Sequence, residues 1–121
     1  MARILLAEDH ELIRKGLRVL LEANKEWLIC GGRGDVQEGV DRSAELQPDL
    51  VILDVTMPVL NGLQAARRIR DRVPKSKILI LSMHDSTQLA NEALRLSADA
   101  YLVKSGPPAL LLETIAALVK G

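Results

Sequence analysis

Three acidic residues stand directly after short apolar runs of this chain. Glu8 and Asp9 follow the run 4–7, and Asp54 ends the run 50–53. In an open α/β fold, side chains at the carboxyl ends of parallel strands lie at the ligand-binding edge of the sheet. At about 4 Å and an effective dielectric near 20, each pair of these carboxylates would repel by roughly 4 kcal/mol. Such a cluster is typical of a site that binds a cation.

Two further polar residues follow the later apolar runs. Ser82 comes after the run 78–81, and Lys104 comes after the run 100–103. An ammonium at the same sheet edge would help to neutralise the carboxylates. Oxygen-only ligands in an incomplete cage suit Mg²⁺, or Mn²⁺, with waters or phosphate oxygens completing the shell.

These residue types predict phosphoryl transfer to a carboxylate. Asp54 could act as the nucleophile and form an acyl phosphate. It needs no general base, because a carboxylate is ionised at neutral pH. Catalysis would then consist mostly of positioning and charge stabilisation, supplied by the cation and Lys104. Ser82 would donate a hydrogen bond to a phosphoryl oxygen.

The elements that must position these groups alternate along the chain. Apolar runs without an alternating pattern predict strands buried on both faces, and segments with helical spacing follow them. This predicts an α/β, flavodoxin-like sheet of five parallel strands in the order 2-1-3-4-5, with five helices on its two faces. The predicted strands are 4–7, 27–31, 50–55, 78–81 and 100–103, and the predicted helices are 12–21, 35–44, 61–72, 86–96 and 107–119.

Length and composition predict one domain over residues 1–121. The chain is 48% hydrophobic with no Phe, so its core must be aliphatic. Sixteen basic and sixteen acidic residues give a formal net charge of zero, which argues against nucleic-acid binding by this segment. No apolar run reaches membrane-spanning length, and there is no signal-peptide pattern. A cytoplasmic location is expected.

The residues at the strand ends resemble those of one known family. The chain is similar to the receiver domain of two-component response regulators, which have the CheY-like fold. The resemblance covers almost the whole chain, and its later part is most similar to the NarL/FixJ (LuxR-type) transcriptional regulators. It is carried by Glu8-Asp9, by Asp54 within Leu53-Asp54-Val55-Thr56-Met57-Pro58, by Gly62, Ser82 and Ala98-Asp99-Ala100-Tyr101, and by Lys104.

The resemblance implies a role for each matching residue. Asp54 is expected to accept the phosphoryl group, with Lys104 and Ser82 assisting. Asp9, Asp54 and the backbone carbonyl of Thr56 are expected to ligate Mg²⁺, with Glu8 acting through a bound water. Ser82 and Tyr101 are the expected switch pair. Three residues hold positions expected to tune the lifetime of the phosphoryl group: Thr56, Met83 and His84.

The resemblance also implies partners and an output. A sensor histidine kinase would donate the phosphoryl group, and the added charge would draw Ser82 inward while Tyr101 fills the vacated space. A homodimer on phosphorylation is compatible with this scheme. Regulators of the NarL/FixJ type continue into a helix-turn-helix domain. We therefore expect this chain to be a fragment whose DNA-binding output domain is absent. The chain would modify itself and would not be a turnover enzyme on an external substrate.

Simpler interpretations exist for each residue. Asp54 could be a turn residue, Asp9 a helix cap and Lys104 a solvated lysine. Ser82 and Tyr101, taken singly, are more often a loop hydroxyl and a core aromatic. His84 could equally have no role.

Three other functions remain open at this stage. A Mg²⁺-dependent phosphohydrolase would share the nucleophile, but position 56 is Thr where such an enzyme needs a second Asp. A nucleotide or flavin binder would need a glycine-rich loop after the first strand, where this chain is acidic. A stand-alone or degenerate receiver would act as a protein-interaction module without phosphorylation.

Overall fold

The computed structural model describes residues 2–8, 11–31, 46–55, 59–83, 87–96 and 98–120. Its strands are β1 (Ala2–Ala7), β2 (Trp27–Gly31), β3 (Leu50–Val55), β4 (Lys77–Ser82) and β5 (Ala100–Val103). Its described helices are α1 (Glu11–Glu22), α3 (Val59–Arg72), α4 (Thr87–Leu96) and α5 (Pro108–Lys120). All five predicted strands are confirmed within two residues at each end. The helix predicted at 35–44 lies outside the described residues.

The strands form one parallel sheet in the order β2-β1-β3-β4-β5, as predicted. Residues 50–53 and 78–80 are at most 1% exposed, so these strands are covered on both faces. A parallel sheet buried in this way requires continuous apolar runs. The order places β3 between β1 and β4, with the carboxyl ends of all the strands at one edge.

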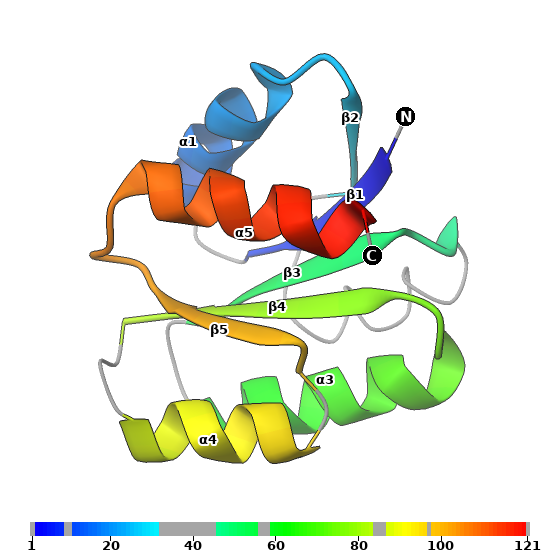
Figure 1. Ribbon diagram of the computed structural model, residues 1–121, viewed down its shortest axis with the longest axis vertical. Helices are drawn as coiled ribbons and strands as arrows, with labels where there is room; N and C mark the ends of the chain where they lie inside the picture. The colour runs from blue at the N-terminus through cyan, green and yellow to red at the C-terminus, as the bar shows by residue number, and fades with distance from the viewer. Residues whose placement is uncertain are drawn as a thin grey trace.

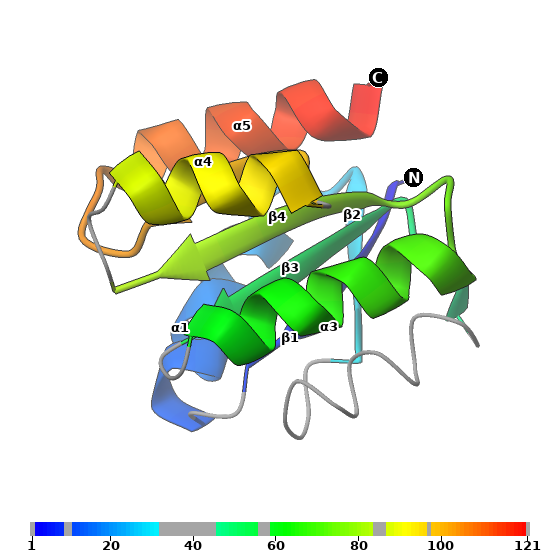
Figure 2. The ribbon, with the colours of Figure 1, turned by 90° about the horizontal axis from the view of Figure 1, so that it is seen from below.

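Alternate strand residues face two separate aliphatic layers. Leu5 and Ala7 belong to the layer under α3 and α4, whereas Ile4 and Leu6 belong to the layer under α1 and α5. Figure 1 shows α1 and α5 on one side of the sheet and α3 and α4 on the other. In the view from below, α3 and α4 lie in front of the sheet (Figure 2). The core is aliphatic, as the lack of Phe requires.

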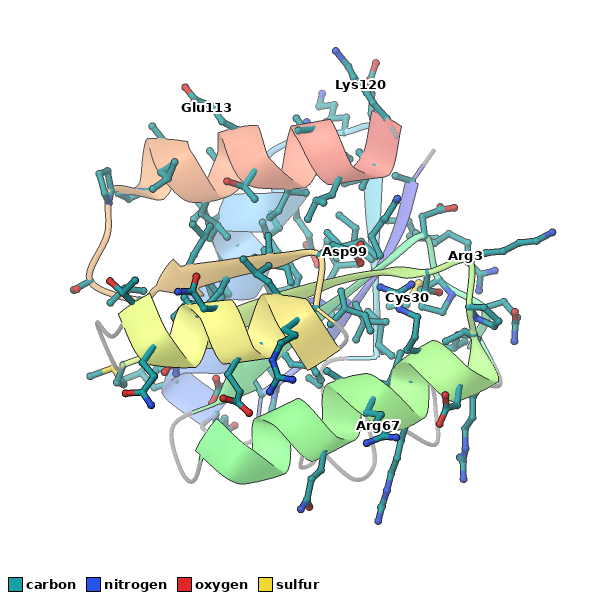
Figure 3. All side chains as sticks on the ribbon, turned by 60° about the horizontal axis from the view of Figure 1, so that its bottom comes forward. Arg3, Cys30, Arg67, Asp99, Glu113 and Lys120 are labelled. Atoms are coloured by element: carbon teal, nitrogen blue, oxygen red, sulfur yellow. The ribbon has the colours of Figure 1, made fainter. Side chains whose placement is uncertain are left out.

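A polar network connects α3, β4 and β5 at the amino-terminal ends of the strands. Arg70, near the end of α3, donates to the carboxylate of Asp99 and to the carbonyl oxygens of Pro74 (3.1 Å) and Ser76 (2.8 Å). The same Asp99 oxygen accepts from the backbone nitrogen of Ile78 at 2.8 Å. Figure 3 shows Asp99 at the turn between α4 and β5. Asp99 therefore links α3, β4 and β5, and this structural role was not foreseen from the sequence.

We expect Asp99→Ala to lower the free energy of unfolding by about 2 kcal/mol and Asp99→Asn by about 1 kcal/mol, since only Asn keeps an acceptor. The Asp99–Arg70 side chains are 27% and 29% exposed, so solvent screens the pair only in part. Urea unfolding measures the change. Breaking the exposed Arg95–Glu92 pair with Glu92→Ala is the control, with an expected loss below about 0.5 kcal/mol. Equal losses in Asp99→Ala and Glu92→Ala would contradict the structural role.

Candidate functional site

The site begins with a buried ion pair that joins the ends of β1 and β5. The Lys104 ammonium nitrogen lies 3.4 Å from a carboxylate oxygen of Glu8. The Glu8 side chain is 0% exposed and that of Lys104 is 11% exposed, although 96 residues separate them in sequence. A buried carboxylate is costly without a counter-charge. Lys104 thus lies at the sheet edge as a counter-charge for Glu8. Its part in phosphoryl transfer stays a prediction.

Backbone groups fix both partners of this pair. Arg14 of α1 donates from its guanidinium to the carbonyl oxygen of Glu8 at 3.1 Å. The backbone nitrogen of Lys104 donates to the carbonyl oxygen of Ser82 at 2.8 Å. The ends of β1, β4 and β5 are therefore tied together. Arg14 was missed in the sequence, because an arginine within a helical pattern carries no sign of a contact with the preceding loop.

Asp54 occupies the next-to-last position of β3. Its backbone pairs with Leu81 of β4, and the preceding residue, Leu53, pairs with Ala7 of β1. Glu8 comes one residue after Ala7, so the backbones of Glu8 and Asp54 lie at neighbouring levels of adjacent strands. The side chain of Asp54 is outside the described part of the structure. The backbone alone places this residue at the edge that holds the Glu8–Lys104 pair.

Ser82 ends β4 and is completely buried. Tyr101 of β5 pairs with Ile80 of β4. Its side chain is half-buried and packs against the layer under α3 and α4. Strand alternation puts Ile80 and Ser82 on one face of β4. The expected switch pair thus belongs to neighbouring strands, and its role as a switch stays a prediction.

The remaining predicted site residues lie in or near undescribed segments. Asp9, Thr56 and His84 are outside the described residues. Met83 is described and is 61% exposed. Within the described ranges, no group of three or more His, Cys, Asp or Glu residues could hold a metal ion. The side chains of two expected carboxylate ligands, Asp9 and Asp54, are outside these ranges.

The residues available at this edge fit a hard cation. Of the three polar side chains that are buried in the described part, Glu8 and Ser82 stand at this edge and carry oxygen donors. Asp9, the residue after Glu8, and Asp54, on the adjacent strand β3, would add carboxylates. Oxygen donors of this kind suit Mg²⁺ or Mn²⁺.

One titratable group near the start of α1 has a shifted pKa. The hydrogen bond and the charge of Lys15, with a smaller effect of Arg14, lower the pKa of the Glu11 carboxyl. The Lys15 and Glu11 side chains are 71% and 70% exposed, so the pair contributes little to stability. The lowered pKa extends the range in which Glu11 is ionised to more acidic pH.

Comparison with known proteins identifies the family of the chain. The family model described as "Response regulator receiver domain" matches residues 4–116. The chain belongs to the response regulator receiver family. This match includes four strands in full and β1 from Ile4 onward, and the family resemblance seen in the sequence is confirmed.

Individual relatives of the chain are transcriptional regulators. It is 33% identical to the uncharacterized transcriptional regulatory protein YxjL of Bacillus subtilis, over 98% of this chain and 55% of that protein. It is 31% identical to the nitrate/nitrite response regulator NarL of Escherichia coli, over 94% of this chain and 53% of NarL. The receiver therefore spans about half the length of these relatives.

Solved structures show the same fold. A two-component response regulator of the LuxR family from an Aurantimonas species superposes with a TM-score of 0.92 and 35% identity, covering all of this chain and 86% of that one. The chain is thus a receiver domain of the type found in NarL- and LuxR-family response regulators. None of the helices that the structure describes is long and apolar enough to cross a membrane.

Proposed function

We propose that the receiver accepts one phosphoryl group on Asp54 from a sensor histidine kinase and uses it as a conformational signal. The observation that carries the proposal is the buried Glu8–Lys104 pair at the edge where β3 presents Asp54. This edge offers an acidic residue, a fixed cation and a buried hydroxyl in Ser82. These are the groups that phosphoryl transfer to a carboxylate needs.

The chain's own residues would perform the transfer as follows. An oxygen of Asp54 attacks phosphorus, a new P–O bond forms, and the P–N bond to the kinase histidine breaks. Lys104 stabilises the charge on the phosphoryl oxygens, and the Ser82 hydroxyl donates to one of them. Later attack of water on phosphorus breaks the new P–O bond and returns Asp54 to a carboxylate, so the phosphoryl group is lost as phosphate.

A divalent cation belongs to this proposal. Asp9, Asp54 and the Thr56 carbonyl would hold Mg²⁺ or Mn²⁺, with Glu8 acting through water. Bound there, the ion would supply positive charge beside the phosphoryl oxygens. Thr56, Met83 and His84 remain the positions proposed to tune the lifetime of the phosphoryl group.

The signal would pass from Ser82 to Tyr101. When Ser82 moves toward the phosphoryl group, Tyr101 would fill the space it leaves and change the surface around β4 and β5. A swing from 1:99 to 99:1 between two states needs roughly 5.5 kcal/mol of differential stabilisation. Charge-assisted hydrogen bonds from Lys104 and Ser82 can supply part of it.

The output would be transcription, in a cytoplasmic protein. Residues 1–121 form one domain in this proposal, and the relatives named above are transcriptional regulators about twice as long. DNA binding would belong to a helix-turn-helix domain outside this chain, and phosphorylation could also promote a homodimer. The receiver would catalyse only its own phosphorylation and dephosphorylation at Asp54, without turnover of an external substrate.

The direct test uses acetyl phosphate as the phosphoryl donor. Incubation with Mg²⁺ should add one phosphoryl group, seen by intact-mass measurement, and EDTA should prevent it. No adduct in the wild-type chain would favour a module that works without phosphorylation. Rapid hydrolysis of many phosphate esters would favour a phosphohydrolase.

We expect Ser82→Ala to slow adduct formation about tenfold or more while the protein stays folded, because one donor to the phosphoryl oxygens is lost. Initial rates with acetyl phosphate measure the effect. Ser76→Ala is a matched control, since Ser76 is 3% exposed but donates to the carbonyl oxygen of Pro48 at the opposite edge of the sheet. An unchanged rate in Ser82→Ala would remove Ser82 from the site.

A further inference from the structure

A cavity of about 280 Å³ opens between α1 and the start of α5, beside the candidate site. Its walls come from four elements: Ile13 and Leu17 of α1, Leu81 of β4, Leu102 of β5 and Leu110 of α5. Both helices cover this face of the sheet in Figure 1. The cavity is therefore built by the tertiary fold and not by a single helix surface.

The lining is apolar except at one point. Among the described residues around the cavity, Lys104 is the one charged side chain, and its ammonium is held by Glu8. The remaining lining consists of aliphatic side chains, Met83, Pro107 and Gly106. Met83 and Leu110 are 61% and 45% exposed. The cavity thus presents apolar walls and two exposed apolar side chains, with its cation already engaged.

We propose that this cavity is a binding site for a small, uncharged, largely apolar molecule of about two fused rings. Ligand sites in proteins are concave, mostly apolar and usually formed before the ligand arrives. An apolar cavity of about 150 Å³ can hold benzene, so about 280 Å³ accommodates a bicyclic molecule. A neutral ligand is favoured over an anion because Glu8 already neutralises Lys104.

Occupancy of the cavity would also change phosphoryl transfer. Lys104 both lines the cavity and pairs with Glu8, so a ligand against its side chain shifts the ammonium relative to the site. This second step rests on the proposed phosphorylation of Asp54, whereas binding itself does not. The ligand would thus act as a second input to the receiver, beside the kinase.

Indole is a suitable probe because it is uncharged and bicyclic. We expect indole to cause saturable amide shifts in the isotope-labelled, unphosphorylated chain, concentrated at Leu17, Leu81, Leu102 and Leu110. Leu17→Phe, which fills the cavity, should weaken binding about tenfold or more. Leu110→Trp, a change at an exposed position, should do the same without a risk to folding.

Leu20→Phe is the matched control. Leu20 lies one turn further along α1, packs half-buried against the same aliphatic layer as Leu17, and lines a different, more open hollow. The affinity of the Leu20→Phe variant for indole should stay within about twofold of the wild-type affinity. Shifts that do not saturate, or equal losses in Leu17→Phe and Leu20→Phe, would overturn the binding site and leave this surface to a macromolecular partner.

The coupling has its own measurement. Saturating indole should change the initial rate of phosphorylation by acetyl phosphate several-fold in the wild type and leave the rate of Leu17→Phe unchanged. Binding without any rate change would overturn the coupling. Absence of the phosphoryl adduct, with or without indole, would contradict the proposed function and leave the binding result standing.

Discussion

Asp54→Asn is expected to fold normally and to lose phosphorylation by acetyl phosphate, with a rate at least about a thousandfold below that of the wild type. The amide lacks the anionic oxygen that attacks phosphorus, and loss of a nucleophile removes a covalent pathway almost completely. Intact mass and the initial rate of adduct formation measure the effect. This variant tests the assignment that all other parts of the proposal depend on.

Asp71→Asn is the control for this substitution. Asp71 is exposed on α3, so the same chemical change there should leave the rate of adduct formation unchanged. An adduct that forms on Asp54→Asn at the wild-type rate would show that another side chain is the phosphoacceptor. Loss of the adduct in both variants would point to an effect of the amide change unrelated to a nucleophile.

The second large effect is expected at Lys104. Lys104→Met should lower the free energy of unfolding by about 3 kcal/mol, because it leaves the completely buried Glu8 carboxylate without this counter-charge. Adding Glu8→Gln should restore most of the loss, since a neutral pair no longer needs compensation. Urea unfolding of the wild type, both single variants and the double variant gives the coupling energy directly.

Lys15→Met provides the matched comparison. It makes the same change in the exposed pair with Glu11, where both side chains are about 70% exposed, and should leave the free energy of unfolding almost unchanged. A loss in Lys104→Met no larger than that in Lys15→Met would mean that the Glu8–Lys104 pair does not stabilise the fold. The pair could then no longer be counted as a fixed part of the site.

Much of the fold was predictable from local patterns. Apolar runs identified all five strands. The rule for crossovers left few possible orders, and the flavodoxin-like order chosen among them is the one observed. The ends of these strands then placed Glu8, Asp54, Ser82 and Lys104 at one edge. The family match supports the same fold.

Other features were not predictable, because they join residues far apart in the chain. The direct contact of Glu8 with Lys104 spans 96 residues, whereas the sequence analysis assigned Glu8 a role through water at a cation. The Arg70–Asp99 connection was missed for the same reason. Arg14 lies near Glu8 in the chain and was missed because an arginine within a helical pattern carries no sign of this contact. Periodicity tells which face a residue occupies, but not which side chain it meets there.

The sequence by itself determined which chemical groups stand at the ends of the strands, because a strand's length and burial are written in its own residues. Only the tertiary structure decided how those groups are paired and what space surrounds them. Strand alternation and the packing of α1 and α5 put the Lys104 side chain between a buried carboxylate and an apolar cavity. That position depends on distances between elements, which no local pattern of residues records.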